Sequence, residues 1–246
     1  MVDGSTGYVK PICELGVKIF ADGADKAGML EMAEKSFIQG LTTNPTLMRR
    51  AGITDYRAFA LDILKDICDK PISFEVFSDD FMEMERQADE IARWASNVYV
   101  KIPVTNTQRE PAYELIERLT GKGIKVNVTA MMTVTQVEAV VEKLDPDVPS
   151  YVSVFAGRIA DTGRDPIPLM KAAVDVVSAN PKAELIWASP RELFNIFQAD
   201  SIGCHVITVS NAVLKKLELV GRDLGEYSLD TVKMFHTDAT SAGFHI

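Results

Sequence analysis

The stretch VYVKIP, residues 98–103, decides the fold and also points to the chemistry. It is a short apolar run with β-branched and aromatic residues, which is typical of a strand buried on both faces. A single charged residue, Lys101, interrupts it. Because a strand of this kind needs hydrogen-bonding partners on both edges, similar runs are expected on either side of it.

Such runs recur along the chain at intervals of about one strand-plus-helix unit. We predict eight strands, over VKIFAD (17–22), GLTTN (40–44), ISFEV (72–76), VYVKIP (98–103), KVNVTA (125–130), YVSVFAG (151–157), ELIWAS (184–189) and HVITVS (205–210). The segments between them favour helices, for example residues 29–36, 81–95 and 114–123. In the second of these, apolar residues recur at helical spacing. Gly123 is expected to end the third.

Strands that alternate with helices imply a parallel sheet buried on both faces. Eight such units in 246 residues favour an α/β fold of the closed (β/α)8 type, a TIM barrel, over an open doubly wound sheet. No GxGxxG motif follows the first strand, which argues against dinucleotide binding. We expect one domain over 1–246, with an N-terminal extension (1–16) and a C-terminal helical tail (212–246) whose end, 237–246, is less structured.

The composition excludes several classes of function. A net charge of −9 disfavours nucleic acid and anionic membranes as partners. No signal peptide and no apolar run of about 18 residues is apparent. Three widely spaced cysteines, Cys13, Cys68 and Cys204, suggest neither disulfides nor a zinc site, and a cytoplasmic location fits.

The three histidines point to no chemistry. Only His205 falls on an expected strand, whereas His236 and His245 lie in the tail, so neither a catalytic triad nor a histidine metal site is expected. Trp187 and the Met131–Met132 pair are interpreted as core or pocket wall, and Cys204 as a small buried residue.

In a barrel of this kind, active-site residues lie at the C-terminal ends of the strands. Polar residues gather there: Asp22, Thr42, Asn44, Glu75, Lys101, Asn127, Thr129, Ser153, Arg158, Ser189, Arg191, Ser210 and Asn211. Each alone would pass for a strand-end cap or a turn residue. Their convergence on one rim is what predicts a site.

Lys101 is the sharpest signal, because lysine is rarely buried without a partner. A site of low dielectric disfavours the ammonium ion, and the neutral amine is the form that attacks a carbonyl to make a Schiff base. The alternative is a lysine that reaches outward from the strand end. Lys18 and Lys125 lie at strand starts, on the opposite face of the barrel.

Asp22 and Glu75 are candidates for the proton transfers that Schiff-base chemistry needs. Each has a structural alternative: Glu75 as an ion-pair partner of Lys101, and Asp22 as a helix N-cap. Arg158, with the turn of Ser189 and Arg191, is suited to grip a phosphate, since arginine offers a two-pronged hydrogen-bond donor. The alternative for both arginines is a surface salt bridge.

At this point the rim residues resemble a known family. The chain is similar to the transaldolases, in the small branch that also contains fructose-6-phosphate aldolase, all Schiff-base (class I) enzymes. The matching motifs are FADGAD (20–25), GLTTNPTL (40–47), FEV (74–76), VKIPVT (100–105), NVTA (127–130), SVFAGRI (153–159) and WASPR (187–191). They occur in the family order and cover most of the chain.

The resemblance implies a role for each matching residue. Lys101 looks like the Schiff-base lysine and Asp22 like the acid/base aspartate. Glu75 and Thr129 resemble the pair that positions the catalytic water. The substrate-binding residues it implies are Thr42, Asn44, Asn127, Ser153 and Phe155, with Arg158, Ser189 and Arg191 at the phosphate. The family uses no cofactor and no metal, and its barrels assemble as homo-oligomers.

The subtype follows from two positions. Aldolase-type members tend to carry glutamine in place of Glu75 and tyrosine in place of Phe155, so the chain looks like a transaldolase that moves a dihydroxyacetone unit between sugar phosphates. A fructose-6-phosphate aldolase, a transaldolase for a sulfonated ketose, and an inert sugar-phosphate binder are the alternatives. The long N-terminal extension, SVFAGR in place of SPFxGR, and the proline in WASPR leave the exact sugar open.

Overall fold

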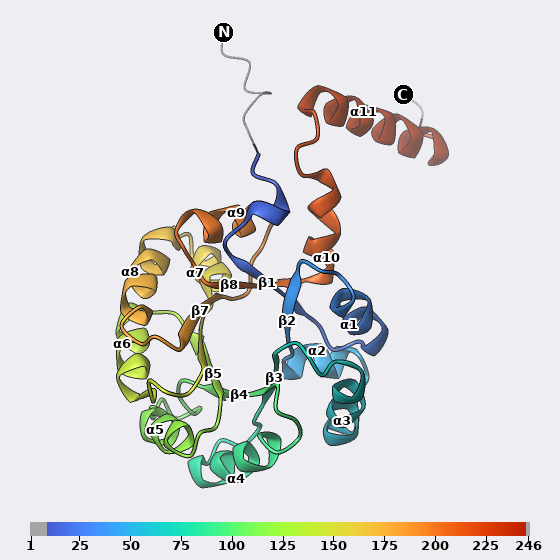
Figure 1. Ribbon diagram of the computed structural model, residues 1–246. Helices are drawn as coiled ribbons and strands as arrows, with labels where there is room; N and C mark the ends of the chain where they lie inside the picture. Colours follow the sequence, from blue (N-terminus) through green and yellow to red (C-terminus); the bar gives the residue numbers. More distant parts are fainter. Residues whose placement is uncertain (1–8, 245–246) are drawn as a thin grey trace.

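Eight parallel strands close into a barrel in which each strand pairs with the next and the last pairs with the first (Figure 1). The computed structural model describes residues 9–244. The strands are β1 (Lys18–Asp22), β2 (Ile38–Thr42), β3 (Ile72–Glu75), β4 (Val98–Pro103), β5 (Val126–Met131), β6 (Ser150–Val154), β7 (Ala183–Trp187) and β8 (Val206–Ser210). The predicted TIM barrel is confirmed.

The helices follow the strands and cover the outside of the barrel (Figure 1). They are α1 (Lys26–Ala33), α2 (Pro45–Arg50), α3 (Tyr56–Asp66), α4 (Phe81–Ile91), α5 (Tyr113–Gly121), α6 (Val134–Lys143), α7 (Ala156–Asp161), α8 (Ile167–Val177), α9 (Phe194–Ser201), α10 (Asn211–Leu214) and α11 (Leu224–Ser241). Two short 3₁₀ helices are η2 (Ile12–Glu14) and η3 (Lys215–Leu219).

Local sequence signals set where these helices start and stop. The side chains of Asp25, Asn44 and Asp80 accept hydrogen bonds from the first turns of α1, α2 and α4. Past the C-terminal end of α5, Gly123 adopts a φ of 79°, in the left-handed region, as predicted for a glycine that ends a helix.

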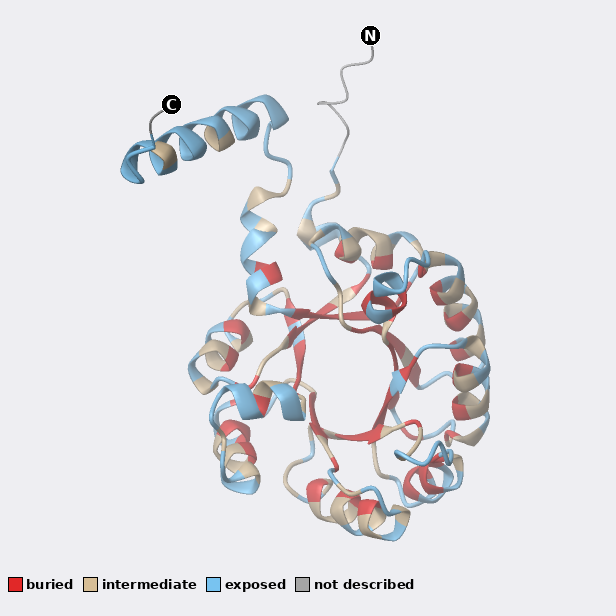
Figure 2. Cartoon of the chain, turned by 180° about the vertical axis from the view of Figure 1, so that it is seen from behind, coloured by how far each residue is buried: buried red, intermediate tan, exposed pale blue. Residues whose placement is uncertain are grey.

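The core consists of the strands and the inner faces of the helices. Figure 2 shows buried residues concentrated there, whereas α11 stands away from the barrel and buries no residue. Met131, Trp187 and Cys204 are buried, as interpreted from the sequence. Met132 is exposed and does not line the pocket, so its assignment to the core or pocket wall is wrong. Among the described residues, no helix has both the length and the apolar character needed to cross a membrane.

The strand register determines which polar residues lie beside one another at the C-terminal end of the barrel. Asp22 pairs with Thr42 across β1 and β2, Glu75 pairs with Lys101 across β3 and β4, and Lys101 pairs with Asn127 across β4 and β5. These pairings place Asp22 beside Thr42, and Lys101 between Glu75 and Asn127, near the C-terminal ends of their strands.

Two expectations need correction. The strand predicted over 151–157 ends at Val154, because the chain turns at Phe155 and enters α7; an apolar run alone does not distinguish a strand from a buried helix start. The tail predicted as less structured over 237–246 is helical to Ser241. Thr237 and Thr240 donate their hydroxyls to carbonyls one turn back, which keeps these residues compatible with a helix. His245 and residues 1–8 lie outside the described residues.

Candidate active site

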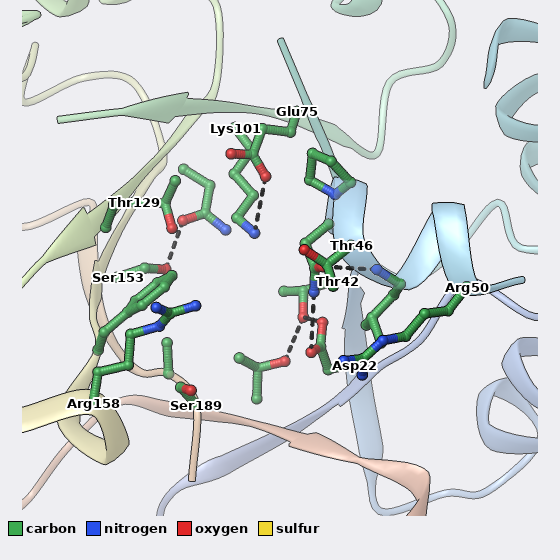
Figure 3. A pocket seen from close by; sticks show the side chains of 18 of the residues that line it. Asp22, Thr42, Thr46, Arg50, Glu75, Lys101, Thr129, Ser153, Arg158 and Ser189 are labelled. Atoms are coloured by element: carbon green, nitrogen blue, oxygen red, sulfur yellow. Dashed lines mark hydrogen bonds and ion pairs between the residues drawn. The ribbon is translucent and has the colours of Figure 1, made fainter. Parts of the chain in front are cut away.

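All twelve residues predicted to form the site line one pocket of about 500 Å³ at the C-terminal end of the barrel (Figure 3). Sequence reasoning had missed further residues of its wall: Pro45, Thr46, Leu47, Arg50, Ala130, Ala188 and Thr208. Ser210 and Asn211, which were also placed on the rim, do not line it; they begin α10.

Lys101 points into the pocket and is 7% exposed. Its Nζ donates a hydrogen bond of 3.0 Å to the Thr43 carbonyl and lies 3.4 Å from Oε2 of Glu75. The alternative of a lysine reaching outward is therefore wrong. The ion pair with Glu75, considered from the sequence as a structural alternative, is present within the pocket itself.

Asp22 lies on another wall of the pocket. Its carboxylate accepts hydrogen bonds from Thr42 Oγ1 at 2.8 Å and from Asn44 Nδ2 at 3.5 Å. Thr42 is in turn hydrogen-bonded to Thr208, so β8 supports Asp22 through β2. Asp22 is not a helix cap, because Asp25 caps α1.

Burial raises the pKa of the Asp22 carboxyl above the ordinary aspartate value. The positive charge of Lys101 and the hydrogen bonds from Thr42 and Asn44 lower the pKa, and burial outweighs them. A carboxyl group of raised pKa is suited to exchange protons close to neutral pH.

A buried hydrogen-bond chain forms the wall on the far side of Lys101. Ser153 Oγ donates to Asn127 Oδ1 at 2.7 Å, and Asn127 Nδ2 donates to Ser73 Oγ at 3.0 Å. Next to it, the buried hydroxyl of Thr129 has no hydrogen-bond partner among the described residues. Since a buried polar group is costly when unpaired, this hydroxyl is suited to bind a water or substrate oxygen.

Tyr56 holds Glu75 in place from outside the pocket. Its hydroxyl accepts a hydrogen bond of 2.8 Å from the backbone N–H of Glu75 and donates one of 3.1 Å to the carbonyl of the same residue. Burial raises the pKa of the Tyr56 hydroxyl, which therefore stays protonated and able to donate. The sequence offered no signal for this contact, because Tyr56 lies on α3, away from the rim motifs.

Three residues predicted to hold a phosphate come together where β6 and β7 end. The Arg158 guanidinium lies 5.5 Å from the centre of the Phe155 ring and forms no ion pair with another described residue. Arg191 forms a salt bridge with Asp161, through Nε at 2.9 Å and through Nη2, and its Nη1 donates to Ser189 Oγ at 3.1 Å. The salt-bridge alternative thus holds for Arg191, although Arg191 also lines the pocket.

The backbone around this end of the pocket is strained or tightly packed. Ser189 and Ala130 adopt φ values of 62° and 67°, which cost non-glycine residues about 1–3 kcal/mol each. A Cβ added to Gly157 would lie 1.6 Å from the Ser189 carbonyl oxygen. Only glycine at position 157 therefore allows α7 to approach the loop after β7 this closely.

The residues present do not suggest a metal centre. No group of three or more His, Cys, Asp or Glu side chains suited to hold a metal ion occurs among residues 9–244.

The fold and the pocket define the class of protein: a TIM barrel with one buried lysine among polar side chains at the C-terminal ends of its strands. Residues 19–246 match the model of the family described as Transaldolase/Fructose-6-phosphate aldolase. The chain belongs to this family, as the sequence resemblance predicted.

Individual relatives support the assignment. The chain is 35% identical to "Probable transaldolase 2" of Listeria monocytogenes over 205 residues, covering 82% of this chain and 88% of that protein. It is 34% identical to "Probable transaldolase" of Lactiplantibacillus plantarum over 218 residues, covering 87% and 96%. Among solved structures, a putative dihydrodipicolinate synthase family protein from Coccidioides immitis superposes with a TM-score of 0.54 at 12% identity, covering 79% of this chain and 66% of that one. This last likeness is one of fold alone.

Proposed function

We propose that the chain is a transaldolase, which transfers a dihydroxyacetone unit from a ketose phosphate to an aldose phosphate without a cofactor. The observation that carries this proposal is the buried amine of Lys101, placed in a polar pocket between Glu75 and the carboxyl of Asp22, whose pKa is raised. Membership of the family implies sugar phosphates as substrates.

In the first half-reaction, the neutral Nζ of Lys101 attacks the C2 carbonyl of the donor, and the carbinolamine loses water to give the Schiff base. Asp22 takes the proton of the C4 hydroxyl as the C3–C4 bond breaks, and the electrons of that bond pass into the iminium. An aldose phosphate leaves with a new aldehyde. A three-carbon enamine stays on Lys101.

In the second half-reaction, C3 of the enamine attacks the aldehyde carbon of the acceptor, and Asp22 returns its proton to the new hydroxyl. Water, held by Glu75 and Thr129, then hydrolyses the Schiff base and releases the product ketose. The unpaired Thr129 hydroxyl and the position of Glu75 beside Lys101 support this role.

The pocket walls suggest how the substrate lies. Asn127 and Ser153 offer hydrogen bonds to the dihydroxyacetone end, while Thr42 and Asn44 hold Asp22 at the C4 hydroxyl. The phosphate is directed to Arg158, Ser189 and Arg191, since guanidinium groups and hydroxyls bind phosphate oxygens well. Phe155 packs under Arg158.

Trapping with borohydride tests the lysine. Reduction in the presence of fructose 6-phosphate is expected to leave a dihydroxyacetone adduct on Lys101, seen by mass spectrometry of the peptides. Lys101→Met should lose both adduct and activity, whereas Lys125→Met, a change at the other end of the barrel, should keep both. No adduct with any ketose phosphate, or an adduct on another lysine, contradicts the proposal.

A fructose-6-phosphate aldolase is the second candidate, since it would use the same lysine and aspartate. Glu75, in place of glutamine, favours transfer over release. Measuring free dihydroxyacetone with and without erythrose 4-phosphate separates the two: a transaldolase should form sedoheptulose 7-phosphate and little free dihydroxyacetone.

The proposal also covers the domain organisation, the oligomeric state and the cellular location of the protein. Because the family model matches both barrel and tail, we treat the chain as one unit. The apolar side chains exposed on α11 favour a homo-oligomer. The free thiols of Cys13, Cys68 and Cys204 suit the reducing cytoplasm.

A further inference from the structure

Arg50 is a pocket residue with no role in the mechanism described above. It lines the pocket from the last turn of α2, and Figure 3 shows its side chain reaching over the pocket on the Asp22 side, opposite Arg158. No hydrogen bond or ion pair joins the Arg50 guanidinium to another residue in the part of the chain that the structure describes. A cation that faces a pocket and lacks a partner is suited to an anionic ligand.

The local structure explains why Arg50 faces inward. Asn44 caps α2 and Pro45 occupies its first position, so the phase of this short helix is set at the rim. Residues three and four apart share a helix face, and Thr46 and Arg50 therefore both line the pocket. The adjacent Arg49 lines a separate hollow instead.

Charge balance indicates what Arg50 binds. Of the three arginines that line the pocket, Arg191 already shares its charge with Asp161 in a salt bridge, whereas Arg158 and Arg50 form no salt bridge among the described residues. A phosphate monoester carries a charge of about −1.5 to −2 near neutral pH. Two unpaired guanidinium groups match such a dianion, whereas Arg158 alone matches a singly charged group such as a sulfonate.

The position of Arg50 indicates which part of the substrate its guanidinium contacts. Under the proposed function, on which this step rests, Asp22 meets the C4 hydroxyl, where the aldose half begins. Asn127 and Ser153 hold the other, three-carbon half. A guanidinium on the Asp22 side therefore lies along the aldose half, which is the half that bears the phosphate.

We propose that Arg50 is a specificity-determining residue that binds the phosphate dianion of the aldose half, across the pocket from Arg158. It selects doubly charged phosphate esters over unphosphorylated sugars and over singly charged sulfonates.

The test compares Arg50→Ala with Arg49→Ala, which removes the same charge from the same helix but outside the pocket. Loss of a charged hydrogen bond weakens binding about tenfold to a hundredfold. The kcat/KM ratio of fructose 6-phosphate over fructose should fall by this factor in Arg50→Ala, mainly through KM, and stay unchanged in Arg49→Ala. Equal losses on both sugars, or equal effects of the two variants, overturn the inference.

A binding measurement separates this inference from the proposed reaction. By calorimetry on the full chain, inorganic phosphate should bind Arg50→Ala about tenfold or more weakly than it binds the unaltered protein, and methanesulfonate binding should change less. If this holds and no ketose phosphate is turned over, the inference stands and the transaldolase proposal falls. If turnover is intact and the Arg50 change leaves phosphate binding unaltered, the inference falls and the transaldolase proposal stands.

Discussion

At the scale of single residues, burial and the neighbouring polar groups act in opposite directions on the pKa of Asp22. Asp22 has a raised pKa although Lys101 and two hydrogen-bond donors favour its ionised form, so the cost of burying its charge dominates. Thr42 and Asn44 limit that cost and fix the orientation of the carboxylate. The same burial that raises the pKa of Asp22 therefore reduces the stability of the folded protein.

This cost predicts a pH dependence for Asp22→Asn. Between the ordinary aspartate pKa of 3.8 and the raised pKa of folded Asp22, the folded state binds more protons than the unfolded state. The contribution of Asp22 to stability therefore falls as pH rises through this window. Relative to the unaltered protein, Asp22→Asn should gain free energy of unfolding between about pH 3.5 and about pH 7. Urea unfolding at the two pH values measures this, and a difference that is constant with pH would contradict it.

At the scale of elements, the end of the pocket near β6 and β7 depends on how closely α7 approaches the loop after β7. The N–H of Gly157 faces the Ala188 carbonyl at 3.4 Å, and there is no room for a Cβ at this position. This packing brings Arg158, on α7, to the same pocket wall as Ser189 and Arg191.

Gly157→Ala is accordingly expected to lower the free energy of unfolding by about 2 kcal/mol or more, because a backbone oxygen must move. It should also weaken inorganic phosphate binding. Gly121→Ala is the matched control, since Gly121 lies in the last turn of α5 with open space around it. That change should be neutral or stabilise the protein by up to about 1 kcal/mol. Thermal unfolding checks both, and equal effects of the two changes would refute the packing argument.

Much of this arrangement was predictable, because strand periodicity and polar strand ends are local signals. All eight predicted strands are present, and the twelve residues predicted for the site line one pocket, whereas Ser210 and Asn211 do not line it. Thr208 was missed because it lies inside β8, two residues before its polar end. Arg50 was missed because its place in the pocket depends on the phase of α2, a helix of six residues too short to show a periodicity.

At the scale of the whole molecule, α11 is the element that the barrel leaves uncovered. It stands apart from the barrel (Figures 1 and 2) and exposes large apolar side chains. These are Leu224, Tyr227, Leu229, Val232, Met234 and Phe235, with Phe244 beyond the helix end. Exposed apolar surface of this kind is typical of a helix that docks on another subunit.

Phe235, 63% exposed, supplies the test of the proposed homo-oligomer. Sedimentation of the full chain is expected to show a species larger than the 27.1 kDa of one subunit. Phe235→Glu should shift it towards the monomer, because a carboxylate would be buried at the interface. Thr237→Glu, which adds the same charge on the polar side of α11, should leave the larger species intact. A monomeric full chain would rule out the proposal.

The closure of the barrel between β1 and β8 has a consequence for how the protein folds. This pairing joins the first and last strands, so it carries the largest loop-closure entropy of any strand pair and is expected to form late in folding. The hydrogen bonds that run from Thr208 through Thr42 to Asp22 cross this seam. Until β1 and β8 pair, Thr42 lacks its contact with Thr208, whereas Thr42 and Asn44 can already donate hydrogen bonds to Asp22. The support of this carboxylate is therefore completed only when the barrel closes.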